Sequence, residues 1–154
     1  MKRISYLLAL SISVLFISCG GSDSTSEENT APPQSMVADE VDPMENKGIG
    51  PISSMELPSE IDATLASEGE NVFNAMCTAC HKVGAKFIGP APNGILSRRS
   101  PEWVMNMILN PEEMVQKDPI ARDLLIEYNG APMANQNLTE DQARAVLEYF
   151  RTLE

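Results

Sequence analysis

The segment Cys77-Thr78-Ala79-Cys80-His81 constrains this chain more than any other part of its sequence. It has the pattern C-x-x-C-H, which is typical of the covalent attachment of a c-type haem. Residues three apart lie on one face of a helical turn, so both thiols can reach the two vinyl groups of one porphyrin and form thioethers. His81 follows directly, and its imidazole can bind the iron. We therefore predict one covalent haem c, with His81 as an axial ligand.

Two other uses of a C-x-x-C pair are the alternatives. A redox dithiol needs alternating strands and helices, which this sequence does not indicate. A structural zinc site needs four ligands. The chain has one histidine and three cysteines in all, and the third cysteine is Cys19, far from the motif.

Weaker motifs accompany the C-x-x-C-H sequence, namely Gly69-x-x-x-Phe73 before it, Gly89-Pro90 after it, a late Pro132-Met133 and an aromatic C-terminal segment. With them, the residues from about Leu65 to the C-terminus resemble a class I monohaem cytochrome c. The resemblance implies an all-α fold of about four to five helices wrapped around one covalent haem. It also implies that Gly69 lets the first and last helices cross closely and that Phe73 packs into the crossing.

Local signals predict where the helices begin and end. Serine, asparagine or aspartate followed by proline is a good helix start, and Thr139 begins a capping box. The predicted helices run from Ile61 to Met76, then from Ser100, Asn110 and Asp118, and finally from Thr139 to about Thr152.

The iron of an electron carrier needs a sixth ligand, and without a second histidine a thioether is the natural choice. Four methionines follow the motif. Met105, Met107 and Met114 lie on predicted helices, where methionine usually fills the core. Met133 lies in a Pro-containing loop before the last helix, where the resembled family places its axial methionine. We expect Met133 to bind the iron opposite His81.

Four further residues gain roles only from the resemblance or from their charge. In the family, a proline carbonyl at the position of Pro90 accepts the Nδ1–H of the axial histidine, which makes the ligand more basic. Trp103 matches a tryptophan that hydrogen-bonds a haem propionate, although core packing would also explain it. Arg98 and Arg99 either pair with the propionates or face solvent.

The N-terminus has the features of an export signal. Lys2 and Arg3 precede an apolar run from Ile4 to Ile17, and Ser18-Cys19 follows as in the lipobox of bacterial lipoproteins. We predict a lipoprotein signal peptide at residues 1–18, lipidation of Cys19 and a location on the periplasmic face of a bacterial membrane. An ordinary cleaved signal and an uncleaved anchor are the alternatives.

The segment after Cys19 predicts a linker. It is rich in Gly, Ser, Pro and acidic residues, has no sustained apolar period and has no aromatic residue. We therefore assign residues 19–58 to a disordered tether and residues 59–154 to the cytochrome c domain.

Charge and motif together predict the function. The formal net charge of −11 argues against nucleic acid as a partner. We expect a membrane-tethered one-electron carrier without substrate chemistry, whose locally basic rim, formed by Lys82, Lys86, Arg98 and Arg99, orients docking. The resemblance implies redox protein partners: a quinol–cytochrome c reductase-type donor, and as acceptor a terminal oxidase or an exported reductase such as nitrous oxide reductase.

Three alternatives remain. A haem-based redox or gas sensor needs Met133 to be absent from the iron or easily displaced. A dihaem peroxidase needs two C-x-x-C-H motifs, and this chain has one. A fixed electron-transfer subunit of a respiratory complex is compatible with the tether.

Overall fold

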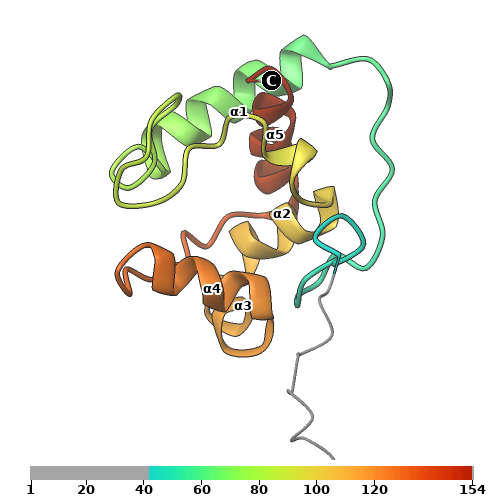
Figure 1. Ribbon diagram of the computed structural model, residues 1–154. Helices are drawn as coiled ribbons and strands as arrows, with labels where there is room; N and C mark the ends of the chain where they lie inside the picture. Colours follow the sequence, from blue (N-terminus) through green and yellow to red (C-terminus); the bar gives the residue numbers. More distant parts are fainter. Residues whose placement is uncertain (1–41, 154) are drawn as a thin grey trace, which may run out of the picture. The chain divides into compact units, whose positions relative to one another are not determined.

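The computed structural model describes residues 42–153, and in this range the chain folds into helices without a β-sheet (Figure 1). The prediction of an all-α domain is confirmed. The elements in chain order are α1 (Ala63–Met76), the short 3-10 helix η1 (Ile95–Ser97), α2 (Pro101–Leu109), α3 (Pro111–Lys117), α4 (Pro119–Glu127) and α5 (Glu140–Arg151).

Polar side chains cap most of these helices as the sequence indicates. Ser100 accepts a backbone N–H of α2, Asp118 accepts one of α4, and Thr139 forms the predicted capping box of α5. Helix α1 begins two residues later than expected, because Asp62 is its N-cap. Asn110 precedes α3 without a capping hydrogen bond from its side chain.

Helices α1 and α5 pack against each other (Figure 1), and their backbones come close together at Gly69 of α1. A Cβ atom at Gly69 would lie 1.9 Å from the backbone oxygen of Ala145 on α5, so only glycine fits this crossing. Next to it, the ring of Phe73 lies 5.6 Å from that of Tyr149 and 5.7 Å from that of Phe150. The close crossing and the aromatic packing expected from the resemblance are both present.

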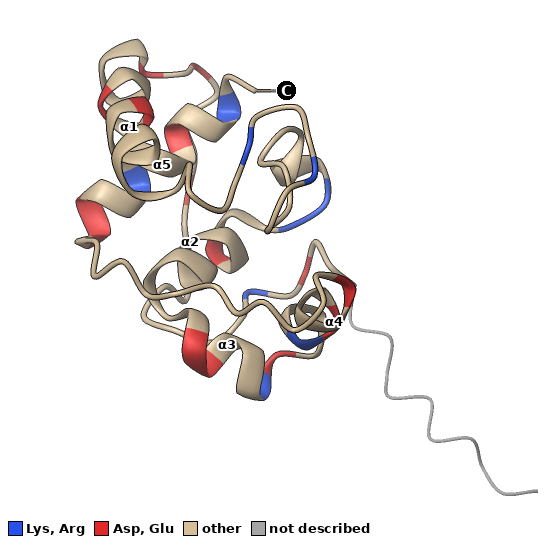
Figure 2. Ribbon diagram, turned by 90° about the vertical axis from the view of Figure 1, so that its left-hand side faces the viewer, with Lys and Arg blue, Asp and Glu red and all other residues tan. Residues whose placement is uncertain are grey.

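A buried carboxylate ties α5 to the start of α1. Glu148 is 1% exposed, pairs with Arg144 at 2.6 Å and Arg151 at 2.7 Å, and accepts the backbone N–H of Asp62 at 2.8 Å. Figure 2 shows acidic and basic positions following one another along α5. Burial alone would raise the pKa of Glu148, but the hydrogen bonds from Asp62 and the two arginines hold that pKa below its ordinary value.

Residues 46–55, which we call the N-terminal strap, pack against the domain, although the sequence predicted a disordered tether from residue 19 to 58. Asn106 of α2 holds the strap, because its side-chain amide donates to the carbonyls of Lys47 at 2.8 Å and Ile52 at 2.9 Å. Its side-chain oxygen accepts the N–H of Ile52 at 2.9 Å. The Ile52 side chain is 6% exposed and belongs to the core.

The boundary prediction failed for a physical reason. Besides the packing of Ile52, the strap is held by hydrogen bonds from its backbone to buried side chains, as when the N–H of Met55 donates to Glu102 at 3.1 Å. Such contacts leave no apolar period in the strap's own sequence. The folded unit therefore begins well before residue 59.

The predicted signal peptide (1–18), the lipidated Cys19 and the tether up to residue 41 lie outside the described residues. Between residues 42 and 153, no helix is long and apolar enough to cross a membrane.

Candidate functional site

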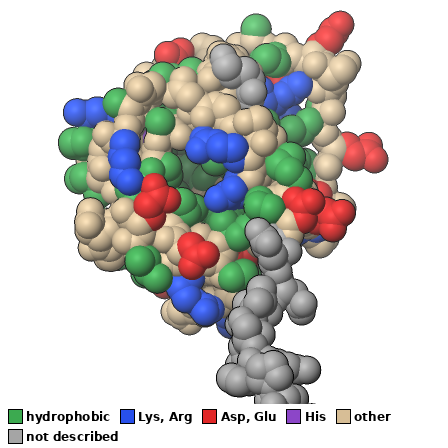
Figure 3. All heavy atoms as spheres, viewed as in Figure 1, with side chains coloured by type: hydrophobic (Ala, Val, Ile, Leu, Met, Phe, Trp, Pro, Cys, Tyr) green, Lys and Arg blue, Asp and Glu red, His purple; other side chains and the backbone are tan. Residues whose placement is uncertain are grey.

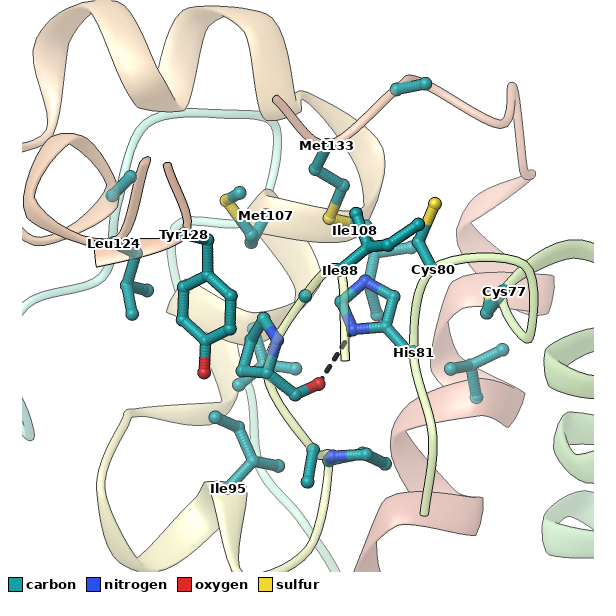
Figure 4. A pocket seen from close by; sticks show the side chains of 18 of the residues that line it. Cys77, Cys80, His81, Ile88, Ile95, Met107, Ile108, Leu124, Tyr128 and Met133 are labelled. Atoms are coloured by element: carbon teal, nitrogen blue, oxygen red, sulfur yellow. Dashed lines mark hydrogen bonds between the residues drawn. The ribbon is translucent and has the colours of Figure 1, made fainter. Parts of the chain in front are cut away.

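The C-x-x-C-H segment continues α1 by one tight turn. The backbone N–H groups of Cys80 and His81 both donate to the carbonyl of Cys77, at 3.0 and 2.9 Å. The Cys77 thiol is half-buried and that of Cys80 is exposed, and both are free. Burial raises the pKa of the Cys77 thiol, and the charge of Cys80 raises it further. Figure 4 shows both cysteines and His81 beside one cavity.

The following loop fixes the orientation of the imidazole. Nδ1 of His81 lies 2.8 Å from the carbonyl oxygen of Pro90. A carbonyl can only accept, so Nδ1 carries the proton and Nε2 keeps its lone pair for a metal. A Cβ atom at Gly89 would lie 2.5 Å from Cε1 of His81, so the ring packs directly on the backbone there. The Gly89-Pro90 pair noted in the sequence thus forms the support of this ring.

The cavity is lined largely by apolar side chains from all five α-helices and from the loops beside them. Figure 4 shows several of these side chains around His81. Prominent among them are Ile88, Ile95, Ile108, Leu124, Val146 and Phe150. A flat apolar group can be enclosed here between the imidazole and the segment that follows α4.

The four candidate methionines divide into two pairs. Met105 and Met114 are 0% exposed and lie in the protein core, away from the cavity. Met133 lines the cavity from the loop before α5 (Figure 4). Met107 of α2 also lines the cavity, although the sequence placed it in the core. Two thioethers therefore face the same space as His81.

The arrangement around Trp103 differs from the expected propionate contact. Its indole Nε1–H donates to the carboxylate of Asp118 at 3.1 Å, and the side chain is 3% exposed. An indole has only this one N–H donor, so none is left for a propionate. Asp118 was identified from the sequence as a helix cap, and nothing in the sequence indicated its contact with a residue fifteen positions earlier.

The two arginines next to the cavity differ from each other. Arg98 is exposed, and its guanidinium donates to the carbonyls of Asn93 at 2.8 Å and Gly94 at 3.2 Å. Arg99 is half-buried, its guanidinium lies 5.3 Å from the ring centre of Trp103, and its Nε atom is buried without a protein partner. Burial lowers the pKa of Arg99, and the charge of Arg98 lowers it further. A buried donor on the cavity wall requires an acceptor, which an anionic ligand group would provide.

The lysines of the predicted basic rim are engaged within the protein. The Nζ atom of Lys86 lies 3.0 Å from a carboxylate oxygen of Glu127 and 4.2 Å from the ring centre of Tyr128. That of Lys82 lies 3.9 Å from the ring centre of Phe87. Figure 3 shows basic, acidic and hydrophobic side chains intermixed around a hollow on one face. This face is therefore of mixed charge rather than uniformly basic.

An all-α domain that places two free thiols and a histidine on the wall of an apolar cavity has the architecture of a covalent haem protein. The sequence model of the family Cytochrome c matches residues 66–154, and the chain belongs to this family.

Solved structures agree with this assignment. Cytochrome c from Rhodothermus marinus is 46% identical over 68% of this chain and 89% of its own, with a TM-score of 0.65. An engineered form of that protein, described as bound to a carbene intermediate, is 45% identical over the same shares, with a TM-score of 0.62. The cytochrome c domain of a Pseudomonas putida protein is 31% identical over 55% of this chain and 85% of its own, with a TM-score of 0.51. Comparison with curated proteins finds none that matches.

The cofactor of a cytochrome c domain is covalent haem c, and the residues of this chain fit it. Cys77 and Cys80 have free thiols for two thioethers, and both line the same largely apolar cavity. The unpartnered Nε of Arg99 matches a propionate, which is an anionic acceptor. His81 offers an unblocked Nε2.

Proposed function

We propose that this chain is a membrane-tethered, one-electron carrier in which Cys77 and Cys80 hold the haem while His81 and Met133 bind its iron. The single observation that carries this proposal is the shared cavity: an imidazole locked by the Pro90 carbonyl and the thioether of Met133 line the same apolar space. The bound haem supplies the reversible exchange of one electron between ferrous and ferric iron.

The residues around the cavity support electron transfer rather than substrate chemistry. The hydrogen bond from Nδ1 to Pro90 makes His81 a stronger electron donor, whereas a thioether such as Met133 favours the ferrous state. The apolar walls exclude water, and exclusion of water favours the less charged ferrous centre as well. When both axial positions are filled by the protein, no site is left for a substrate. Arg99 is the propionate contact that this geometry supports best.

Haem attachment is tested by expressing the protein with a cytochrome c maturation system. We expect the wild type to bind haem covalently and to show the pyridine haemochrome spectrum of two thioethers. Cys77→Ala and Cys80→Ala should each leave one thioether, which shifts that spectrum, or no haem at all. An unchanged spectrum in the double variant would remove the basis of the proposal.

A haem-based gas sensor is the second candidate, and one observation favours it. Apart from the N–H of Ala131, no backbone-to-backbone hydrogen bond is found for residues 131–138. Loops held this weakly open at low cost in free energy. Carbon monoxide separates the two functions, because a carrier with an intact bond from Met133 to iron binds it slowly or not at all. Rapid binding by the wild type would favour the sensor.

The membrane tether and the location rest on the sequence alone. The lipobox-like segment before Cys19 supports lipidation and exposure on the periplasmic face of a bacterial membrane. Cys19→Ser should move the protein from the membrane fraction to the soluble fraction without changing its visible spectrum. A cleaved Cys19→Ser protein that stays in the membrane fraction would contradict the lipid anchor.

The redox partners follow from this location. We propose a quinol–cytochrome c reductase-type donor and, as acceptor, a terminal oxidase or an exported reductase such as nitrous oxide reductase. The mixed face around the cavity suits short-lived docking, since it lacks a single dominant charge. Reduction of the purified protein by a quinol oxidoreductase and its reoxidation by each acceptor, followed in the visible spectrum, tests the assignment. The proposed acceptor is wrong if the ferrous protein is not reoxidised by it.

A further inference from the structure

Asp118 is a buried carboxylate that lies behind the wall of the haem cavity. Its side chain is 2% exposed. One oxygen accepts the indole N–H of Trp103 at 3.1 Å and the backbone N–H of Ala121 at 2.8 Å. The other oxygen accepts the side-chain amide of Asn46 at 2.6 Å. Three N–H donors converge on it, which is the hydrogen-bond pattern of an ionised carboxylate.

No cation neutralises this carboxylate at close range. Among residues 42–153, Asp118 forms no ion pair with a lysine or arginine, and its three hydrogen-bond donors are neutral groups. The other buried carboxylates are paired: Glu102 lies 3.4 Å from the ammonium of Lys47, and Glu148 contacts two arginines. Burying an unpaired charge is costly, so a helix cap alone explains Asp118 poorly, because a neutral asparagine caps a helix equally well.

The contacts of Asp118 connect it to the cavity. Trp103 lines the cavity, its indole N–H at the ring edge donates to Asp118, and the guanidinium of Arg99 lies over the ring at 5.3 Å from its centre. Asp118 is also close enough to act on Arg99. Its negative charge raises the pKa of Arg99 and so offsets part of the lowering that burial causes. On the other side, Asn46 belongs to the N-terminal strap. The strap, Asp118, Trp103 and the cavity wall therefore form one connected network.

We propose that Asp118 is a positioning residue of the haem site, which fixes Trp103 on the cavity wall and lowers the reduction potential of the haem through its buried charge. This inference rests on the proposed electron-carrier function. An anion near the iron stabilises the ferric state more than the ferrous state, and water-free surroundings strengthen that effect. The fixed negative charge of Asp118 thus opposes the rise in potential that a methionine ligand causes.

The test is the reduction potential of the full-length, haem-loaded protein, measured by titration with redox mediators in the wild type and in Asp118→Asn. Asparagine keeps the size and one acceptor oxygen for Trp103 and the helix cap, but it removes the charge and loses the hydrogen bond from Asn46. We expect the potential of Asp118→Asn to move upward, with only a modest fall in the midpoint of thermal unfolding from the lost contact with Asn46. A merely structural role predicts the opposite sign, because a loosened wall admits water and water favours ferric haem. An unchanged or lowered potential overturns the proposal.

Glu102→Gln is the matched control. It removes the same charge from a buried carboxylate that also touches the strap, through the N–H of Met55 at 3.1 Å, but that does not line the cavity and already has a lysine partner. We expect its potential to shift much less than that of Asp118→Asn. Equal upward shifts in both variants would assign the effect to net charge and overturn the specific role of Asp118.

Asp118→Ser keeps the test decisive should Asp118→Asn fail to load haem. Serine retains a helix-capping oxygen but carries no charge, so the potential should again rise above that of the wild type. A potential that is unchanged or lower overturns the proposal. These results are distinct from failure of the proposed function, which would appear as a wild type without covalent haem or without a reversible one-electron couple.

Discussion

The crossing of α1 and α5 makes a quantitative prediction for Gly69→Ala. The new Cβ would lie 1.9 Å from the carbonyl oxygen of Ala145, 2.3 Å from its carbonyl carbon and 2.8 Å from the backbone nitrogen of Val146. All three atoms are backbone, so no rotation of a side chain relieves the contact. The two helices must separate by about 1.5 Å to restore an ordinary van der Waals distance.

Two opposing effects set the size of the change. Alanine is the better helix former and would stabilise α1 by about 1 kcal/mol. Separation of the helices weakens the packing of Phe73 on Tyr149 and Phe150, where each aromatic pair contributes about 0.5–1.5 kcal/mol beyond its buried area. Overpacking of a core costs a further ~1–3 kcal/mol. We therefore expect a net loss of roughly 2–4 kcal/mol in the free energy of unfolding.

Urea unfolding of the haem-loaded protein, followed by far-UV circular dichroism and by haem absorbance, measures this loss. Ser67→Ala is the control, because Ser67 is exposed on the same helix and away from the crossing. It should gain a few tenths of a kcal/mol from helix propensity alone. If Gly69→Ala is as stable as the wild type, the close crossing does not determine the packing of these helices and the reasoning is wrong.

Three further predictions concern single residues. Asn106→Ala should cost roughly 2–4 kcal/mol, because the backbone groups of the strap lose their partners, and limited proteolysis should then cleave within residues 46–55. The folded-state pKa of Glu148 is lowered, so the stability it contributes is present above the unfolded pKa and is lost as the pH falls below about 4. Glu148→Gln should remove that part of the acid dependence in urea titrations at several pH values, and equal slopes in both proteins would contradict it. Gly89→Ala should push the ring of His81 away from the Pro90 carbonyl and raise the reduction potential, which potentiometry would detect.

Short motifs with a fixed geometry were the part of this structure most accessible from the sequence. Ser100, Asp118 and Thr139 cap the helices they were predicted to cap, because a side chain two or three residues from its partner leaves little freedom. The turn from Cys77 to His81 is equally local. The hydrogen bond from His81 to Pro90 spans only nine residues, and the family resemblance indicated it.

Contacts between segments far apart in the chain were not accessible in this way. The strap is held by Asn106, which is separated from Ile52 by 54 positions, and polar contacts of this kind leave no periodic signal. Trp103 was matched to a propionate by the resemblance, whereas its N–H donates to Asp118 in the folded chain. The sequence predicted that Met107 fills the core, as methionines on helices usually do, but Met107 lines the cavity. The spacing of apolar residues along α2 cannot distinguish a side chain in the core from one on the cavity wall.

The ligand of the iron opposite His81 is the most direct test of the whole account. Ferric haem bound by methionine sulfur shows a weak charge-transfer band at the red end of the visible spectrum, and sulfur ligation raises the reduction potential. We expect the wild type to show this band and Met133→Ala to lose it, bind carbon monoxide and have a lower potential. Met105→Ala, Met107→Ala and Met114→Ala should keep the band, the buried Met105 and Met114 at a cost of roughly 2–5 kcal/mol in stability. A band that survives Met133→Ala and disappears in Met107→Ala would give the ligand role to the second methionine of the cavity. A wild type without the band that binds carbon monoxide rapidly would contradict the electron-carrier account.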